Sequence, residues 1–164
     1  MELPKRLIKF LRKHKVDFDV QVHTQTFTAS QTAEAEHVSG KKVAKAVMVK
    51  AGGVDTMIVL PASRTVDLFK LSTALGTQDV RVEGEKEFVD LFPDCEAGAM
   101  PPFGKLYGLP CLLDRSLRDA DDLYFNAGNH WETVRIAAAD FLRLSKAVLG
   151  DFSVAGKKVG VLKI

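Results

Sequence analysis

Two apolar runs that flank a Gly-Gly pair constrain the fold of this chain more than any other feature. Residues 43–50 and 56–60 are rich in Val, Met, Ile and Leu, and Gly52 and Gly53 lie between them. Glycine tolerates the positive φ angles of tight hairpin turns, so this pattern predicts an antiparallel strand pair. Pro61 ends the second run, because proline cannot donate to a sheet ladder. At least part of the sheet is therefore antiparallel.

Lys45 occupies an unusual position in the first of these strands. Successive strand side chains point to opposite faces, so this lysine shares a face with the β-branched residues Val43, Val47 and Val49. An unpaired ammonium on such a face is costly, and perturbed titratable groups are over-represented at functional sites. A lysine near a strand end can instead extend its charged group to water. The strand pattern alone does not decide between these interpretations.

The rest of the chain mixes helices and strands without a regular strand-helix-strand repeat. Helices are predicted within the first fifteen residues and at residues 28–37, 67–75, 83–91 and 137–148. Further strands are predicted at residues 18–22, 80–82, 112–113, 123–125 and 133–136. Glycine and proline are dense in residues 94–110, which indicates irregular backbone there. We expect a single compact α+β domain with a mixed, largely antiparallel sheet flanked by helices.

Composition excludes several classes of protein. The chain has 164 residues, of which 46% are hydrophobic and 27% charged, as expected for one globular domain. No apolar run reaches the roughly 20 residues of a membrane span, and the N-terminus lacks a secretory signal, so we expect a cytoplasmic protein. Basic residues crowd the first helix, namely Lys5, Arg6, Lys9, Arg12, Lys13 and Lys15. Such a face attracts phosphates or is simply solvated.

Most catalytic motifs are absent from the sequence. The four histidines are scattered rather than paired at metal-ligand spacing, and no GxSxG, P-loop or GxGxxG motif occurs. Two loops remain as candidates. Residues 98–104 combine glycines and prolines, and such a loop can hold amides toward a carbonyl or can simply connect two elements. Residues 126–130 form a predicted hairpin turn, at which His130 can donate a hydrogen bond or transfer a proton.

Four segments together resemble a known family. They are Val43-Ala44-Lys45, residues 92–98 (FPDCEAG), residues 101–104 (PPFG), and residues 126–130 (NAGNH) with Glu132 close behind. In order and spacing they resemble the YbaK/prolyl-tRNA-synthetase-associated domain, a stand-alone relative of the prolyl-tRNA synthetase editing domain. The similarity runs from about Leu3 to Leu144. We therefore expect a deacylase-like domain at residues 1–149 and an extension at residues 150–164, packed on the domain or trailing from it. The final apolar run, residues 159–164, is either a late edge strand or a docked tail.

The resemblance implies trans-editing, which is hydrolysis of the ester that joins a wrong amino acid to the 3′ end of a tRNA. Family members remove small residues such as alanine, cysteine or serine, notably from tRNA for proline, and need no metal or other cofactor. The family's strand lysine corresponds to Lys45 and its GxxxP loop to residues 98–102. These positions are expected to hold the tRNA end and to orient the aminoacyl carbonyl, while a tRNA hydroxyl assists attack by water. The implied partner is the aminoacylated tRNA acceptor end, with a synthetase as a second candidate and no membrane.

The resemblance also defines a set of candidate site residues. The expected catalytic residues are Lys45 and Gly98. The expected substrate-binding residues are Phe27, Thr28, Ala46, Ala99, Met100, Pro101, Pro102, Phe103, Gly104, Gly128, Asn129 and His130. Many relatives carry a small polar residue in place of Ala46, so the accepted amino acid can differ here. Two alternatives remain: a non-catalytic module that binds tRNA or a synthetase, and a hydrolase of other acyl esters.

Overall fold

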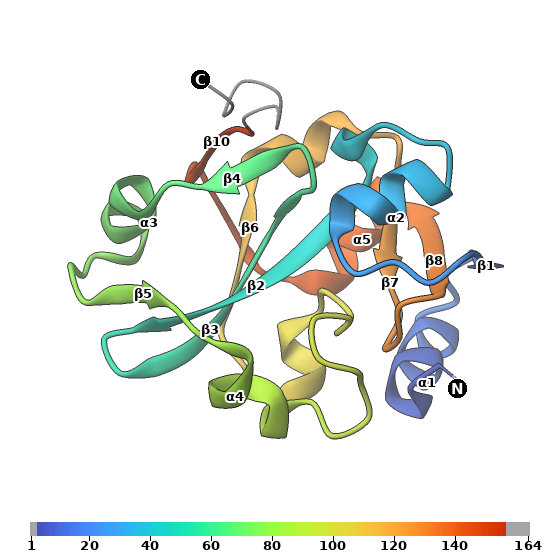
Figure 1. Ribbon diagram of the computed structural model, residues 1–164, viewed down its shortest axis with the longest axis horizontal. Coiled ribbons are helices and arrows are strands. Elements are labelled where there is room, and N and C mark those ends of the chain that lie inside the picture. Colours follow the sequence, from blue (N-terminus) through green and yellow to red (C-terminus); the bar gives the residue numbers. More distant parts are fainter. Residues whose placement is uncertain (1–2, 157–164) are drawn as a thin grey trace.

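The computed structural model describes residues 3–156, in which helices surround a central five-stranded sheet (Figure 1). The α-helices are α1 (Lys5–Lys13), α2 (Ala29–Ala35), α3 (Leu68–Leu75), α4 (Glu85–Phe88) and α5 (Ala138–Ser145). Short 3-10 helices are η1 (Gly40–Lys42), η2 (Val89–Leu91), η3 (Gly104–Tyr107) and η4 (Arg115–Asp119). The strands are β1 (Phe18–Val22), β2 (Ala44–Ala51), β3 (Val54–Pro61), β4 (Arg64–Val66), β5 (Val80–Val82), β6 (Cys111–Asp114), β7 (Asp122–Asn126), β8 (Glu132–Ala137), β9 (Val148–Gly150) and β10 (Ser153–Ala155). The expected strand or tail at residues 159–164 lies outside the described residues.

The central sheet has the strand order β5-β2-β3-β6-β9 and mixes both strand directions. The predicted hairpin is confirmed: β2 and β3 pair antiparallel along their full lengths, with Gly52 and Gly53 at φ angles of 55° and 81° in the turn. β6 runs parallel to both β3 and β9, whereas β5 pairs antiparallel with β2. The expected α+β domain with a mixed, largely antiparallel sheet is therefore confirmed.

A second, antiparallel sheet carries the hairpin of residues 126–130. Its order is β1-β8-β7, and it stands at the right of the view in Figure 1 with α1 below it. One parallel bridge, between Val43 and Tyr124, joins the start of β2 to β7. The second sheet therefore lies beside the end of the central sheet at which β2 begins.

The main hydrophobic core anchors the glycine- and proline-rich segment. Phe103 is fully buried, and its ring contacts those of Phe10, Phe125 and Phe141 at centroid distances of 5.4, 5.5 and 5.0 Å. Burying such a side chain contributes about 1.5–3 kcal/mol, and aromatic contacts add to this. The loop that begins at Gly98 is thus attached to a rigid core at its C-terminal end.

Two predicted helices are shorter than expected. The prediction of a helix at residues 137–148 was wrong at its C-terminal end, because α5 stops at Ser145 and Lys146 takes a left-handed conformation with φ 49°. The residues that follow form β9, which gains a parallel partner in β6. Of the helix predicted at residues 83–91, only α4 is α-helical. The 3-10 helix η2 follows it directly.

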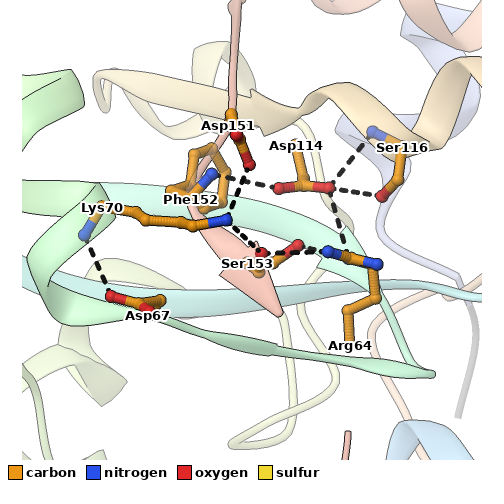
Figure 2. A network of polar contacts seen from close by, with 8 residues as sticks. All are labelled: Arg64, Asp67, Lys70, Asp114, Ser116, Asp151, Phe152 and Ser153. Atoms are coloured by element: carbon orange, nitrogen blue, oxygen red, sulfur yellow. Dashed lines mark hydrogen bonds and ion pairs between the residues drawn. The ribbon is translucent and has the colours of Figure 1, made fainter. Parts of the chain in front are cut away.

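The C-terminal strands are tied into the domain by a polar network (Figure 2). Arg64 donates from Nε to the Ser153 hydroxyl at 2.6 Å and from Nη2 to the Ser153 carbonyl at 3.0 Å. The buried carboxylate of Asp114 accepts from the Ser116 hydroxyl and, at 3.4 Å, from the backbone N–H of Phe152. Phe152 itself is fully buried in a small core against the central sheet. Residues 148–155 therefore pack on the domain.

Candidate functional site

The two candidate loops meet through a short ladder of hydrogen bonds. The N–H of Glu96 donates to the carbonyl of Gly128 at 2.8 Å, and the N–H of Gly128 donates to the carbonyl of Ala99 at 2.8 Å. The Glu96 carboxylate also accepts from the N–H of His130 at 3.2 Å. Segments about thirty residues apart in the sequence thus form one rigid unit, with Gly98 at its exposed edge.

Two glycines are required where the loops touch. Gly98 and Gly128 have φ angles of 81° and 98°, a region that other residues rarely adopt. A Cβ on Gly128 would lie 2.8 Å from the ring of Pro4, so a side chain there is excluded by space as well as by conformation. A Cβ on Gly98 would lie 3.8 Å from Cε1 of His130. The glycine therefore leaves the face of the loop open beside the imidazole.

Within the described residues, only one ring nitrogen of His130 is hydrogen-bonded. Nε2 lies 2.9 Å from the carbonyl of Ala97; because a carbonyl only accepts, Nε2 carries the proton in the neutral ring. Nδ1 is then an acceptor, and it is buried without a hydrogen-bond partner among residues 3–156. The ring of Phe27 lies against the imidazole at a centroid distance of 5.6 Å. This geometry presents a fixed hydrogen-bond acceptor beneath an aromatic ring.

Asn129 holds the turn rather than pointing to solvent. Its side chain is fully buried, and its oxygen accepts from the N–H groups of Trp131 and Glu132 at 3.0 and 2.7 Å. Its amide nitrogen donates to the Glu132 carboxylate at 2.9 Å. These contacts set the direction from which His130 leaves the hairpin.

Lys45 lies on β2 opposite Leu60, half-buried and without an anionic partner in the described part of the chain. Burial lowers the pKa of its ammonium below the usual value. Its neighbours on the same face, Val47 and Val49, pack into a separate small core. A desolvated and unpaired lysine is a form of perturbed group that functional sites contain more often than structural ones.

Backbone register relates Lys45 to the second loop. Val43 bridges Tyr124 in the parallel sense, so two residues further along each strand stand Lys45 and Asn126. Asn126 is the last residue of β7 and the first of the loop. No hydrogen bond or ion pair between residues 3 and 156 joins Lys45 to either loop. The structure therefore unites Phe27, Gly98, Ala99, Gly128 and His130 directly, and it brings Lys45 to the same end of the sheets through the backbone alone.

The segment before α2 supplies the other predicted contact residues. Thr28 caps α2, since its hydroxyl accepts from the N–H of Gln31 at 3.1 Å, as the sequence pattern predicted. Phe27 precedes it with 67% of its surface exposed. The underside of α2 packs on Val43 through Ala33, so this segment lies on the same side of β2 as Lys45.

Several predicted substrate-binding residues are structural parts of the core. Met100 and Phe103 are buried in the main core, and Pro101 and Pro102 are buried between them. Gly104 begins η3, where a Cβ would lie 2.8 Å from that of Cys111.

Ala46 lies on the face of β2 opposite Lys45. It packs against the main core, the same core that contains Met100 and Phe103. Its side chain and that of Lys45 therefore leave the strand in opposite directions.

A cluster that the sequence did not reveal fastens the segments on either side of the first loop to α1. Nε of Arg6 lies 2.7 Å from the Asp94 carboxylate, and the guanidinium stacks 4.4 Å above the ring of Tyr107. The Tyr107 hydroxyl donates to Asp94 at 3.0 Å and lies 3.2 Å from the Cys95 sulfur. These partners lie far apart in the sequence, and only the abundance of basic residues in the first helix hinted at a role for Arg6.

Other chemistry finds little support in the described residues. Burial raises the pKa of the Cys95 thiol to about 12 and that of Cys111 to about 11, so neither is an activated nucleophile. Within residues 3–156, no three His, Cys, Asp or Glu side chains group closely enough to hold a metal ion. Across the same residues, no helix has the length and apolar character needed to cross a membrane.

Comparison with known families identifies the class. Residues 23–144 match the aminoacyl-tRNA editing domain, and the chain belongs to this family. The matched range includes both loops, Lys45 and the segment before α2. The expected class of enzyme, an aminoacyl-tRNA deacylase, is thereby confirmed.

Individual relatives agree with this assignment. The chain is 31% identical over 156 residues to the multifunctional Ser/Thr-tRNA deacylase ProXp-y of Escherichia coli K12, covering 90% of each protein, and it matches the O157:H7 protein equally well. The crystal structure of a candidate trans-editing enzyme for prolyl-tRNA synthetase has a TM-score of 0.78 at 19% identity, with 92% of this chain and 96% of that chain covered. A hypothetical protein of known structure gives a TM-score of 0.80 at 18% identity, over 92% of this chain and all of the other. These structures establish the shared fold.

Proposed function

We propose that this protein hydrolyses, in trans, the ester of tRNA that carries a wrong small amino acid, with serine as the first substrate to test. Serine belongs to the small residues that the family resemblance implies, and the relative with 31% identity is a Ser/Thr-tRNA deacylase. Alanine, cysteine and threonine are the next candidates, with tRNA for proline as the proposed carrier. The proposed location is the cytoplasm. The observation that carries the proposal is the junction of the two loops, where the His130 ring lies beside the open face of Gly98 and its buried Nδ1 has no hydrogen-bond partner within residues 3–156.

The first loop supplies donors for the reacting carbonyl. The N–H groups of Gly98 and Met100 donate to no acceptor within residues 3–156. In the proposed reaction water attacks the ester carbonyl carbon, and these amides stabilise the oxyanion that develops. The carbon–oxygen bond to the ribose then breaks, its oxygen takes a proton, and the products are a free amino acid and tRNA with a free terminal hydroxyl.

Lys45 and His130 hold the substrate in this proposal. The Lys45 ammonium, at the start of β2, has no anionic partner in the described part of the chain and is suited to the phosphate or ribose of the terminal nucleotide. Nδ1 of His130 accepts a hydrogen bond from the α-amino group or from a ribose hydroxyl. Neither residue needs to act as a general base, since the neighbouring tRNA hydroxyl assists the attacking water.

The basic face of α1 offers a path for the acceptor stem. Lys5, Lys9 and Arg12 are exposed, and they line a surface hollow of about 620 Å³ that extends to Glu132 beside the hairpin. Phosphate contacts of this kind give affinity that falls as salt rises. The face therefore leads an acceptor stem toward the loop junction.

A panel of mischarged tRNAs tests the proposal. Purified protein is incubated with Ser-, Thr-, Ala- and Cys-tRNA and with correctly charged Pro-tRNA, and release of the amino acid is followed against buffer. Loss of the Lys45 charge in Lys45→Ala is expected to lower kcat/KM for the preferred substrate by about 100-fold. Lys86 is exposed on α4 and is not one of the proposed site residues, so Lys86→Ala is the matched control and should retain wild-type activity.

Two outcomes would contradict the proposal. One is the absence of hydrolysis above buffer for every charged tRNA in the panel. The other is a Lys45→Ala variant whose rates equal those of the Lys86→Ala control. Tight binding of tRNA without any turnover would instead identify the chain as a non-catalytic tRNA-binding module.

A further inference from the structure

A separate cavity of about 520 Å³ lies apart from the loop junction, where β3 ends and β4 begins. Its walls come from η1, η4 and the last residue of β10 as well as from the turn after Pro61. This volume falls in the range of cavities that bind small molecules. None of the residues assigned above to the editing site lines it.

Three cationic side chains line this cavity, and each has N–H groups without an acceptor in the described residues. Lys41 and Lys42 come from η1, and their ammonium groups make no hydrogen bond or ion pair with any residue from 3 to 156. Arg64 comes from β4, and Figure 2 shows its guanidinium held by the Ser153 hydroxyl and carbonyl. Nε of Arg64 also lies 3.9 Å from the Asp114 carboxylate. Its Nη1 donates to no acceptor in the described residues. A guanidinium held in this way is preorganised to bind an anion.

The remaining walls carry different chemistry. Asp119 and Asp121, from η4 and the segment after it, contribute carboxylates. Pro61, Ala120 and Ala155 contribute apolar surface. Cations bind phosphate, carboxylates accept hydrogen bonds from ribose hydroxyls, and apolar surface covers a base. A phosphorylated ribonucleoside can use all three.

We propose that this cavity binds a ribonucleotide, with its phosphate at Lys41, Lys42 and Arg64. The ligand comes either from the acceptor strand of tRNA or from a free mononucleotide. Binding of the tRNA acceptor strand rests on the function proposed above, and the position of the cavity is consistent with this source. Pro61 in its wall pairs with Ala44, the residue that precedes Lys45 on β2. A nucleotide held here would approach the editing site along the same end of the sheet.

Equilibrium binding without hydrolysis tests the site. The full chain is titrated with each of the four ribonucleoside 5′-monophosphates, with inorganic phosphate, and with uncharged tRNA. The test variant is Lys42→Glu, and the matched control is Lys86→Glu, which makes the same charge change on an exposed helix outside the cavity. We expect Lys42→Glu to weaken binding of the preferred mononucleotide by about tenfold or more, and the control to change it less than about twofold.

The arms of the experiment separate the two sources. Competition between mononucleotide and uncharged tRNA supports the acceptor strand, and binding of the mononucleotide without competition supports a free nucleotide. Equal effects of Lys42→Glu and Lys86→Glu on every ligand would overturn the proposal. So would binding of inorganic phosphate as tight as that of all four mononucleotides, since the base and ribose would then contribute nothing. Because no step requires ester hydrolysis, an inactive enzyme would leave this result standing.

Discussion

Glu83 is buried beside the central sheet, and its burial predicts how the stability of the protein depends on pH. Only 5% of its surface is exposed, and neither carboxylate oxygen has a hydrogen-bond partner within residues 3–156. Burial raises the pKa of Glu83 from 4.5 to about 7; the Asp55 carboxylate acts in the same direction, and Lys50 opposes it. Lys50 is already paired with Asp55 at 2.7 Å, so it neutralises Glu83 only in part.

The raised pKa fixes the sign of the effect. Below the unfolded pKa of 4.5, Glu83 is protonated in both the folded and the unfolded chain, and its contribution to stability is complete. As pH rises, the unfolded chain loses its proton first, so the free energy of unfolding falls until the folded group has also ionised near pH 7. Each pKa unit corresponds to about 1.4 kcal/mol, so the displacement from 4.5 to about 7 amounts to about 3 kcal/mol.

Urea unfolding followed by circular dichroism measures this difference. Across the range from about pH 5 to about pH 8, the wild-type protein should lose most of that stability, whereas Glu83→Gln should show a much flatter profile. Glu85→Gln, which removes an exposed carboxylate two residues away, should keep the wild-type slope. Parallel profiles for the wild-type and Glu83→Gln proteins would refute the argument that burial of this carboxylate governs the pH dependence.

Three further substitutions test the packing of the C-terminal strands and of the site. Phe152→Ala should lower the free energy of unfolding by about 3–5 kcal/mol if residues 148–155 belong to the folded domain, whereas Val154→Ala at an exposed position should cost little; equal effects would contradict this. Gly128→Ala should cost about 2–3 kcal/mol because both conformation and space exclude a side chain, while Gly108→Ala, with open space around it, should cost about 1 kcal/mol in the same melts. Arg6→Met should cost at most about 1 kcal/mol, since its ion pair is partly exposed, yet should raise KM for charged tRNA if the pair steadies the first loop; an unchanged KM would argue against that role.

Local signals explain which parts of the fold could be predicted from the sequence. The hairpin of β2 and β3 follows from two β-rich runs and a Gly-Gly turn, all within eighteen residues of one another. The helix predicted at residues 67–75 ends where expected, because the next residue, Gly76, readily takes the left-handed conformation that closes a helix. In both cases the deciding interaction lies between near neighbours, so the residue types alone determine the outcome.

Partners distant in the sequence decide the elements that the sequence did not show. β9 and β10 have only three residues each. β9 pairs with β6 and β10 pairs with β4, and both partners lie much earlier in the sequence. The unit formed by Glu96, Ala99 and Gly128 has the same origin, since no local pattern predicts which carbonyl each N–H will find. The sequence could name the residues of both loops but not the contact between them, which is what leaves an acceptor on His130 beside Gly98.

The alternation of a strand also limits what the sequence could say about Lys45 and Ala46. Period-two spacing places them on opposite faces but does not say which face the site occupies. In the structure Ala46 packs against the core that anchors the first loop, whereas Lys45 shares a side of β2 with the segment before α2. A larger residue at position 46 would therefore press on the core beneath the loop before it met a substrate. A substitution that enlarges residue 46 should therefore change selectivity by moving the loop, and it should lower the stability of the protein at the same time.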